Sequence, residues 1–478
     1  MNILALEVST SSAKAMVYST TEGILDSYSI SYNQSISNVA SQDPEGVYKT
    51  VLVCARNLIK LGQYKIDIIG LASTWHIFLL LDQYRKPLTK IQTWANTESA
   101  DTVSQYRQNQ QFSRLVYHKT GCPIHSIYPL WKWIYLKDKI QLPEQVFISS
   151  KPEYIFEQIT GEIAISRSVA SGTGFMNINT LDWDQEILEI AGLGQDQLAP
   201  LADYDYFAYL KKNVATELGL VAGIPVVITG PDGALNQIGS GALKEGIMTL
   251  SVGTSAAIRV VSPQVILPEE PSTWCYYVAE GKRLAGAATS GAGNCVDWFK
   301  NKISSDNFNY GELEQLAAGI KAEEAPIFLP FLYGERCPGW QDSRTGGFYA
   351  LQGSHFIGDL YYSLLEGILF NLYHSYKILT ELGNYPQEIR VSGGINNSDY
   401  WLQMLADILQ REITISTIKD ASTMGAVAIA EKVMGIITEL EDFDSSTIKK
   451  KIPDLKKTSL YEERFSKYLK WYKATGID

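Results

Sequence analysis

The chain has 478 residues, of which 45% are hydrophobic and 19% are charged. These fractions are those of globular proteins and exclude a disordered chain, which is poor in apolar residues and rich in net charge. Acidic side chains outnumber basic ones by 52 to 41, for a net charge of −11. Nucleic-acid binding is therefore not expected, because it needs a basic face. The length predicts two or three domains of ~100–200 residues each.

The five cysteines stand singly in the sequence, which predicts reduced thiols in a cytoplasmic protein. The N-terminus has no basic segment and carries the acidic Glu7, so a signal peptide is not expected. No apolar run reaches the ~18 residues that a membrane-spanning helix needs, so no membrane association is predicted.

The first predicted elements are repeated in the second half of the chain. Residues 3–18 and residues 246–261 both predict a strand, a turn of small hydroxyl residues and a second strand. Residues 6–13 laid on residues 250–257 match at five of eight positions. The echo predicts two related α/β domains that face each other. Each would contribute one phosphate-binding turn, since small residues let backbone amides and hydroxyls approach an anion.

Apolar strands alternate with amphipathic helices along both halves, which is typical of α/β proteins. Strands are predicted at 66–72, 77–81, 225–230 and 389–392, and helices through 360–372 and after Ser398 as N-cap. The charged segment from residue 439 onward is predicted to be a peripheral helical appendage. A boundary near 241–246 divides the chain into predicted domains 1–243 and 244–478.

Two carboxylates interrupt this apolar pattern where strands end. Asp232 follows the strand 225–230, at a position where ligands bind in α/β sheets and where it could accept a proton from a substrate hydroxyl. The alternative is a turn aspartate that bonds its own backbone. Glu7 lies in the first apolar strand, and a magnesium ion bridging to phosphate would supply its missing partner. The alternative is an edge side chain that faces solvent or Lys14.

Two glycine-rich turns, 251–255 and 392–398, follow predicted strands, and the second precedes a helix whose N-terminus would favour a phosphate. Each alone is more often an ordinary turn. Together with the first hairpin turn and Asp232, they indicate a nucleotide site. Trp75 and His76 lie between two strands and could form the wall of a polar-ligand pocket, although a lone histidine is more often structural.

These motifs, in this order over nearly the whole chain, resemble the FGGY family of carbohydrate kinases. The segments that carry the resemblance are 230–233, 251–255, 290–294 with Trp298, 334–340, 366–368, 392–394 with Trp401, and 422–426. The family implies an α/β fold of two RNase H-like domains, as in actin and hexokinase, with the active site in the cleft between them. It also implies ATP and Mg²⁺ as cofactors, and dimerisation is common, so a homodimer is implied.

By matched position, the family implies roles for individual residues. Asp232 would be the catalytic base, Trp75 and His76 would bind the sugar together with Asp232, and Glu7 and Asp232 would be the metal-associated carboxylates. The residues implied near the nucleotide and its phosphates are Thr10, Lys14, Gly253, Thr254, Gly293, Asp297, Gly394 and Ser398.

Within the family the chain is most similar to gluconate kinases, through His76 with 79–82 and the segments 121–125, 129–132, 170–174 and 182–184. Gluconate is therefore the expected substrate. Xylulose kinases share some of these segments, so D-xylulose or another ketose is the alternative.

Two motifs depart from the family pattern. The usual D-x-G-T is Glu7-Val8-Ser9-Thr10, and the usual W-x-D-x-R is 94–98, which ends in Glu98. If the family's arginine pairs with a sugar acid, Glu98 would repel gluconate. These changes leave a further alternative open, a catalytically weakened kinase-like sugar sensor.

Overall fold

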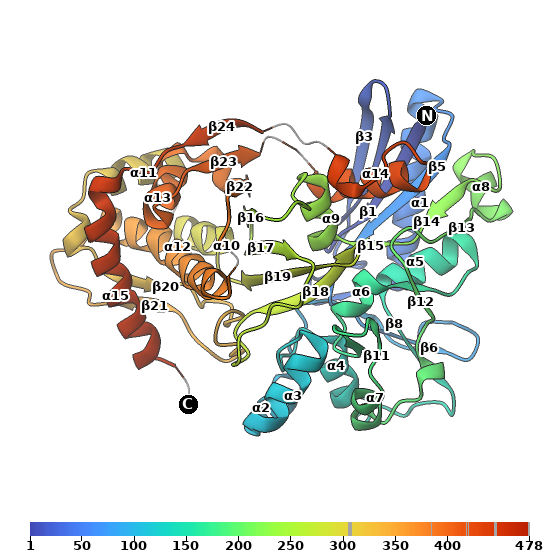
Figure 1. Ribbon diagram of the computed structural model, residues 1–478, viewed down its shortest axis with the longest axis horizontal. Coiled ribbons are helices and arrows are strands. Elements are labelled where there is room, and N and C mark those ends of the chain that lie inside the picture. The colour runs from blue at the N-terminus through green and yellow to red at the C-terminus, as the bar shows by residue number, and fades with distance from the viewer. Residues whose placement is uncertain (305–307, 384, 417, 419, 444–446, 477–478) are drawn as a thin grey trace.

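The computed structural model describes residues 1–304, 308–383, 385–416, 418, 420–443 and 447–476. The chain forms two α/β parts, each built on a seven-stranded mixed sheet (Figure 1). The N-terminal sheet lies on the right of the view and the C-terminal sheet on the left. None of the helices in the described ranges has the length and apolar character needed to span a bilayer.

The N-terminal sheet is centred on β1, whose apolar residues are buried on both faces, as expected for a strand covered by helices on either side. β1 pairs antiparallel with β2 and parallel with β5, which follows the crossover helix α1 (Pro44–Gly62). The strand order is β13 (Phe207–Tyr209), β14 (Pro225–Val227), β5 (Ile68–Ser73), β1 (Asn2–Val8), β2 (Ser12–Ser19), β3 (Gly23–Ser31), with β15 (Gly230–Pro231) also on β5.

The C-terminal sheet has the same arrangement and confirms the internal repeat predicted from residues 3–18 and 246–261. β16 pairs antiparallel with β17 and parallel with β22, which follows the long helix α12 (Ile357–Glu381). Leu250 on β16 opposes Val391 as Leu6 on β1 opposes Leu71. The order is β18 (Trp274–Ala279), β19 (Lys282–Thr289), β17 (Ala256–Ser262), β16 (Ile247–Val252), β22 (Glu388–Gly393), β23 (Ile413–Ser416), β24 (Thr447–Lys451).

Two helices cross closely between the sheets. α9 (Asp232–Gly239) packs on α14 (Ala421–Val433), and α14 also packs on β1 and β5 although it comes from the C-terminal part (Figure 1). Glycines make the crossing possible, because a Cβ at Gly239 would collide with the carbonyl of Ala421, and one at Gly425 with that of Leu235. The crossing ties the two parts together next to the ends of β1 and β15.

The prediction of a peripheral appendage after residue 439 is wrong. β24 is the edge strand of the C-terminal sheet, and α15 (Thr458–Ala474) is packed into the domain. Arg464 on α15 is 1% exposed and forms an ion pair of 2.6 Å with the buried Glu366 of α12. The many exposed lysines of this segment hid the buried aromatic and arginine face of the helix in the sequence pattern.

The remaining elements cover the sheets or extend the N-terminal part. The expected N-cap is confirmed, since Ser398 Oγ accepts a 2.9 Å hydrogen bond from the Trp401 amide at the start of α13 (Asp399–Leu409). The other α-helices in the described ranges are α2 (Ala100–Arg107), α3 (Gln110–Thr120), α4 (Pro129–Leu136), α5 (Lys151–Thr160), α6 (Arg167–Ser171), α7 (Gln185–Ala191), α8 (Lys212–Leu218), α10 (Gly293–Trp298) and α11 (Tyr310–Ala318). Short strand pairs are β4 (Ser41–Gln42) with β7 (Ile91–Gln92), β6 (Leu79–Asp82) with β8 (Val146–Ser149), β9 (Ile165–Ser166) with β12 (Leu201–Ala202), β10 (Met176–Asn177) with β11 (Asp182–Trp183), and β20 (Ile327–Leu329) with β21 (Gly347–Tyr349).

Candidate active site

Asp232 lies at the edge of the N-terminal sheet where β15 ends and α9 begins. Because Pro231 pairs with Ser73 at the end of β5, the residues after β5 come to the same edge. Asp232, Trp75 and His76 accordingly line one cavity of about 270 Å³. The Gly233 amide donates a 2.7 Å hydrogen bond to Asp232 Oδ1. Burial raises the pKa of Asp232, and the charge of Glu7 raises it further.

His76 is a neutral hydrogen-bonding group in this cavity. Burial, and then the charge of Arg336, lowers its pKa to about 3. Its Nδ1 lies 2.8 Å from the carbonyl oxygen of Gly172, which can only accept, so the proton is assigned to Nδ1 and Nε2 is an acceptor. Trp75 is fixed beside it by a 2.9 Å hydrogen bond from Nε1 to the carbonyl of Ser168. The pair supplies an apolar wall and one acceptor.

The first hairpin turn reaches the same cavity through Thr10. The Ser9 hydroxyl closes the turn by donating to the carbonyl of Ser12 at 2.9 Å and accepting from its amide at 3.0 Å. Thr10 Oγ1 accepts a 3.2 Å hydrogen bond from the Trp94 indole. The serine that replaces the family glycine therefore holds the turn by its own side chain.

Glu7 and Lys14 reach across to the C-terminal part. Both carboxylate oxygens of Glu7 accept hydrogen bonds from α14, at 2.7 Å from Ser422 and 2.9 Å from Thr423. Lys14 forms an ion pair with Asp420 and does not line the cavities described here. Glu7 thus lies close enough to affect Asp232 and also joins β1 to the N-terminus of α14.

The expected nucleotide residues meet in a second cavity, of about 340 Å³, on the C-terminal part. Gly293 must be small here, since its amide donates a 2.9 Å hydrogen bond to the carbonyl of Gly253 and a Cβ would lie 2.5 Å from that oxygen. The Tyr310 hydroxyl donates a 2.6 Å hydrogen bond to Asp297 in the same wall. The predicted residues that line this cavity are Gly253, Thr254, Gly293, Asp297, Gly394 and Ser398.

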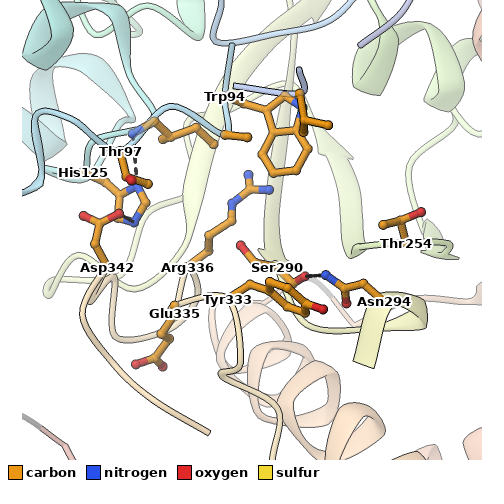
Figure 2. A pocket seen from close by; sticks show the side chains of 14 residues that line it. Trp94, Thr97, His125, Thr254, Ser290, Asn294, Tyr333, Glu335, Arg336 and Asp342 are labelled. Atoms are coloured by element: carbon orange, nitrogen blue, oxygen red, sulfur yellow. Dashed lines mark hydrogen bonds and ion pairs between the residues drawn. The ribbon is translucent and has the colours of Figure 1, made fainter. Parts of the chain in front are cut away.

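A third cavity, of about 500 Å³, is lined by the residues that Figure 2 shows. It shares Thr254 with the nucleotide cavity and Trp94, Ile127 and Arg336 with the Asp232 cavity. The middle cavity therefore adjoins both of the others, and the three together extend from Ser398, the N-cap of α13, to Asp232, the first residue of α9. A phosphate chain bound along this line would run from the glycine turns toward the carboxylate.

Sequence reasoning missed three cations near the acceptor side. Lys151 is fully buried and donates hydrogen bonds to the carbonyl of Ser9 at 2.8 Å and to Gln42 at 3.1 Å. Burial lowers its pKa to about 7, while the charges of Asp232 and Glu7 oppose that shift. Arg259 and Arg336 line the Asp232 cavity. Arg336 lies in segment 334–340 and Arg259 lies close to segment 251–255, but no local sequence pattern distinguishes a cation that points inward from one at the surface.

The expected repulsion by Glu98 has no counterpart in these cavities. Glu98 is exposed, and the neighbouring residue that lines the middle cavity is Thr97. Asn96 is buried, and its carbonyl accepts a 2.8 Å hydrogen bond from the buried Lys132. The Asn96 side chain accepts a 3.3 Å hydrogen bond from the Glu98 amide, so this substituted residue makes its contact within the motif itself.

Comparison with known proteins identifies the family to which the chain belongs. Residues 2–239 match the N-terminal domain of the FGGY family of carbohydrate kinases, and residues 248–432 match its C-terminal domain. A gluconokinase of Bacillus subtilis is 30% identical over 461 residues, covering 93% of this chain and 89% of that protein. Two solved structures from Lactobacillus acidophilus, a gluconate kinase and a ligand-bound xylulose kinase, each superpose with a TM-score of 0.92 at 28% identity, covering 99% of this chain and 98% of theirs. The chain belongs to the FGGY family of carbohydrate kinases.

Proposed function

We propose that the chain transfers the γ-phosphoryl group of ATP to a hydroxyl of gluconate and forms 6-phosphogluconate. The observation that carries the proposal is that Asp232, Thr10 and Ser255 line one cavity, which adjoins the cavity of the glycine turns through the middle one. An acceptor hydroxyl and the end of a phosphate chain would meet there. The gluconate and gluconokinase names of similar proteins support the acid as substrate.

On the acceptor side, Asp232 is the general base. It accepts the proton of the attacking hydroxyl as the new oxygen–phosphorus bond forms and the bond to ADP breaks. His76 Nε2 accepts a hydrogen bond from another sugar hydroxyl, and Trp75 covers the apolar face of the carbon chain. Catalysis comes mainly from positioning and from charge stabilisation, since phosphoryl transfer needs little covalent assistance.

On the donor side, the residues fit ATP with Mg²⁺. The carboxylates of Glu7 and Asp232 supply hard oxygen ligands, and burial and then the charge of Glu7 raise the pKa of Asp232, so a divalent cation bound by both would relieve that repulsion. Within the described ranges no cluster of three or more histidine, cysteine or acidic side chains could hold a metal, so the ion would depend on phosphate oxygens as well. When bound, Mg²⁺ neutralises charge on the phosphoryl oxygens.

The test is ADP release from ATP and Mg²⁺ with gluconate, D-xylulose, L-ribulose or glycerol as acceptor. We expect the highest kcat/KM with gluconate. A higher kcat/KM with D-xylulose would exclude gluconate as the preferred substrate. D-Xylulose is the second candidate, because a xylulose kinase structure is as similar to this chain as the gluconate kinase structure is. If ATP binds but no acceptor is phosphorylated, the result would favour the alternative of a catalytically weakened, kinase-like sugar sensor. Glu7→Asp with Ser9→Gly would then be expected to raise turnover.

The cytoplasmic location stays a prediction from the isolated cysteines, and the homodimer stays a prediction from the family resemblance. Light scattering on the purified chain would measure the oligomeric state, and a homodimer would have twice the chain mass of 53.2 kDa.

A further inference from the structure

Lys151, the first residue of α5, is a fully buried cation that is bonded to neutral groups. Within the described structure both of its hydrogen bonds go to uncharged oxygens, those of the Ser9 carbonyl and the Gln42 side chain. A buried ammonium that is not paired with a carboxylate is costly, and an apolar side chain of similar size would fill the same space without that cost. Packing alone therefore does not account for a lysine at this position.

Both acceptors of Lys151 belong to the first hairpin turn or to its support. The carbonyl of Ser9, in the turn, lies 2.8 Å from the amine, and Gln42 of β4 accepts at 3.1 Å. Gln42 is itself fully buried and donates a 2.8 Å hydrogen bond to the carbonyl of Thr10, the next residue of the turn. The Ser37 hydroxyl donates to the same carbonyl at 3.0 Å. Donors of the protein thus occupy both carbonyl oxygens and tie the turn to α5 and β4.

With these carbonyls occupied, Thr10 offers donors to the cavity that it lines together with Asp232. In the described part of the chain the Thr10 amide donates to no protein group. The Thr10 hydroxyl accepts a 3.2 Å hydrogen bond from the Trp94 indole, so its own proton is available to donate. An amide and a hydroxyl on one residue are suited to bind the oxygen of a phosphate.

Lys151 also places positive charge behind the turn. It lines none of the three cavities described above, so it would act through the turn rather than on the ligand itself. Burial lowers the pKa of Lys151, and the charges of Asp232 and then Glu7 oppose that shift, so the amine lies within electrostatic reach of both carboxylates. A phosphate bound at the turn would add negative charge and favour the ammonium further. The cation and the phosphate would therefore stabilise each other.

We propose that Lys151 is a positioning residue for phosphoryl transfer, which together with Gln42 holds the first hairpin turn where Thr10 receives the terminal phosphate of ATP. The inference rests on the proposed function, since it takes the turn as the site of that phosphate. Ser9 closes the turn internally, whereas Lys151 fixes it to the rest of the domain. Loss of the ammonium removes this anchor and leaves the Ser9 carbonyl dipole without a cation beside it.

The test is Lys151→Met, which keeps the length of the side chain and removes the ammonium. Titration calorimetry measures the Kd of ADP and of the β,γ-imido analogue of ATP, each with Mg²⁺. The Kd of the analogue should rise about 10- to 100-fold, as for the loss of a hydrogen bond from a charged donor. The Kd of ADP should stay within about twofold, because the residues of the nucleotide cavity belong to the C-terminal part.

A double-mutant cycle with Thr10→Val separates positioning from packing. Valine keeps the shape of threonine and removes its hydroxyl, so part of what Lys151 positions is already missing in this background. Lys151→Met should therefore raise the Kd of the analogue by a factor about threefold smaller, or less, in Thr10→Val than in the wild type. A role in packing alone would raise it by the same factor in both.

Lys137→Met is the matched control. Lys137 follows α4 and, like Lys151, donates from its amine to a backbone carbonyl, that of Ala191 at 2.9 Å. It lines none of the three cavities, and its charge is not among those that shift the pKa of Asp232 or Lys151. The ratio of the two Kd values should be the same in this variant as in the wild type.

Gln42→Leu keeps the inference testable if Lys151→Met does not fold. It removes the donor to the Thr10 carbonyl and should also weaken binding of the analogue relative to ADP. A wild-type ratio of the two Kd values in Lys151→Met, or in Gln42→Leu where that variant replaces it, would overturn the proposal. Equal effects of Lys151→Met in both backgrounds of the cycle would also overturn it. If the wild type phosphorylates no acceptor but Lys151→Met still loses affinity for the analogue alone, the proposed function fails and this inference stands.

Discussion

Replacement of Asp232 by asparagine tests the proposed chemistry most directly. Asparagine has the same shape, and its side-chain oxygen can still accept the 2.7 Å hydrogen bond from the Gly233 amide, so the start of α9 should be kept. The substitution removes the negative charge and the basicity of the group. Because the nucleotide cavity is lined by other residues, ATP binding should be nearly unchanged.

The expected loss follows from the role of a general base. Such groups contribute about 10²–10⁴-fold to rate, which corresponds to about 2.7–5.4 kcal/mol of transition-state stabilisation. We therefore expect kcat with the preferred acceptor to fall by ~10²-fold or more. Coupled ADP release measures kcat, and titration calorimetry measures ATP affinity in the same preparation.

Asp203→Asn is the control for this experiment. Asp203 pairs with Arg167 at the surface, at 2.8 Å, and lies outside the three cavities, so its kcat should stay within twofold of the wild type. Turnover of Asp232→Asn equal to that of the wild type would remove Asp232 from the role of base. Loss of ATP affinity together with turnover would refute the separation of the two cavities.

The pH dependence of activity tests the surroundings of the same carboxyl. Asp232 must be ionised to accept a proton, so activity should fall as the pH is lowered through its pKa, which burial and the charge of Glu7 hold above the usual aspartate value. Glu7→Gln removes that charge, and we expect the acidic limb of the kcat/KM profile to move to lower pH. The position of the limb, rather than the maximal rate, is the readout. An unmoved limb would contradict the electrostatic coupling.

Two further predictions concern stability. Gly239→Ala places a methyl group against the carbonyl of Ala421 and should lower the free energy of unfolding by about 1–3 kcal/mol in urea titration, whereas Gly353→Ala, in open space, should change it by less than ~0.5 kcal/mol. Equal effects of the two would contradict the close crossing. Arg464→Met leaves the buried Glu366 without its ion-pair partner and should lower the free energy of unfolding by about 3–5 kcal/mol. Adding Glu366→Gln should recover part of the loss, and a deeper loss in the double variant would refute this account.

The elements and turns that depend on local pattern could be predicted from the sequence. The two hairpins were found because each combines an apolar strand with a small-residue turn, and these features are encoded within ten residues or so. Gly293 and Gly394 were expected at the nucleotide from the family resemblance, and at Gly293 the structure gives a reason for glycine, since a Cβ there would lie 2.5 Å from the carbonyl oxygen of Gly253. Their meeting in one cavity follows from the strand ends that carry them.

The cations of the site could not be predicted in this way. Lysine and arginine are usually surface residues, and nothing around Lys151 in the sequence indicates that its amine reaches the carbonyl of Ser9, 142 residues earlier. Lys14 shows the reverse case. The family resemblance implied that Lys14 lies near the phosphates, whereas in the structure it pairs with Asp420, whose position depends on how the two parts of the chain pack.

The environment of Asp232 depends on that same packing. Glu7 lies on β1 of the N-terminal sheet and raises the pKa of the proposed base, yet both of its oxygens are held by hydroxyls of α14, which comes from the C-terminal part. Glycines at the crossing of α9 and α14 let the two helix backbones come into direct contact, with no side chain between them. The position of α14 relative to β1 therefore sets part of the electrostatic field at the base, and the two halves of the chain contribute jointly to a carboxylate that only one of them carries.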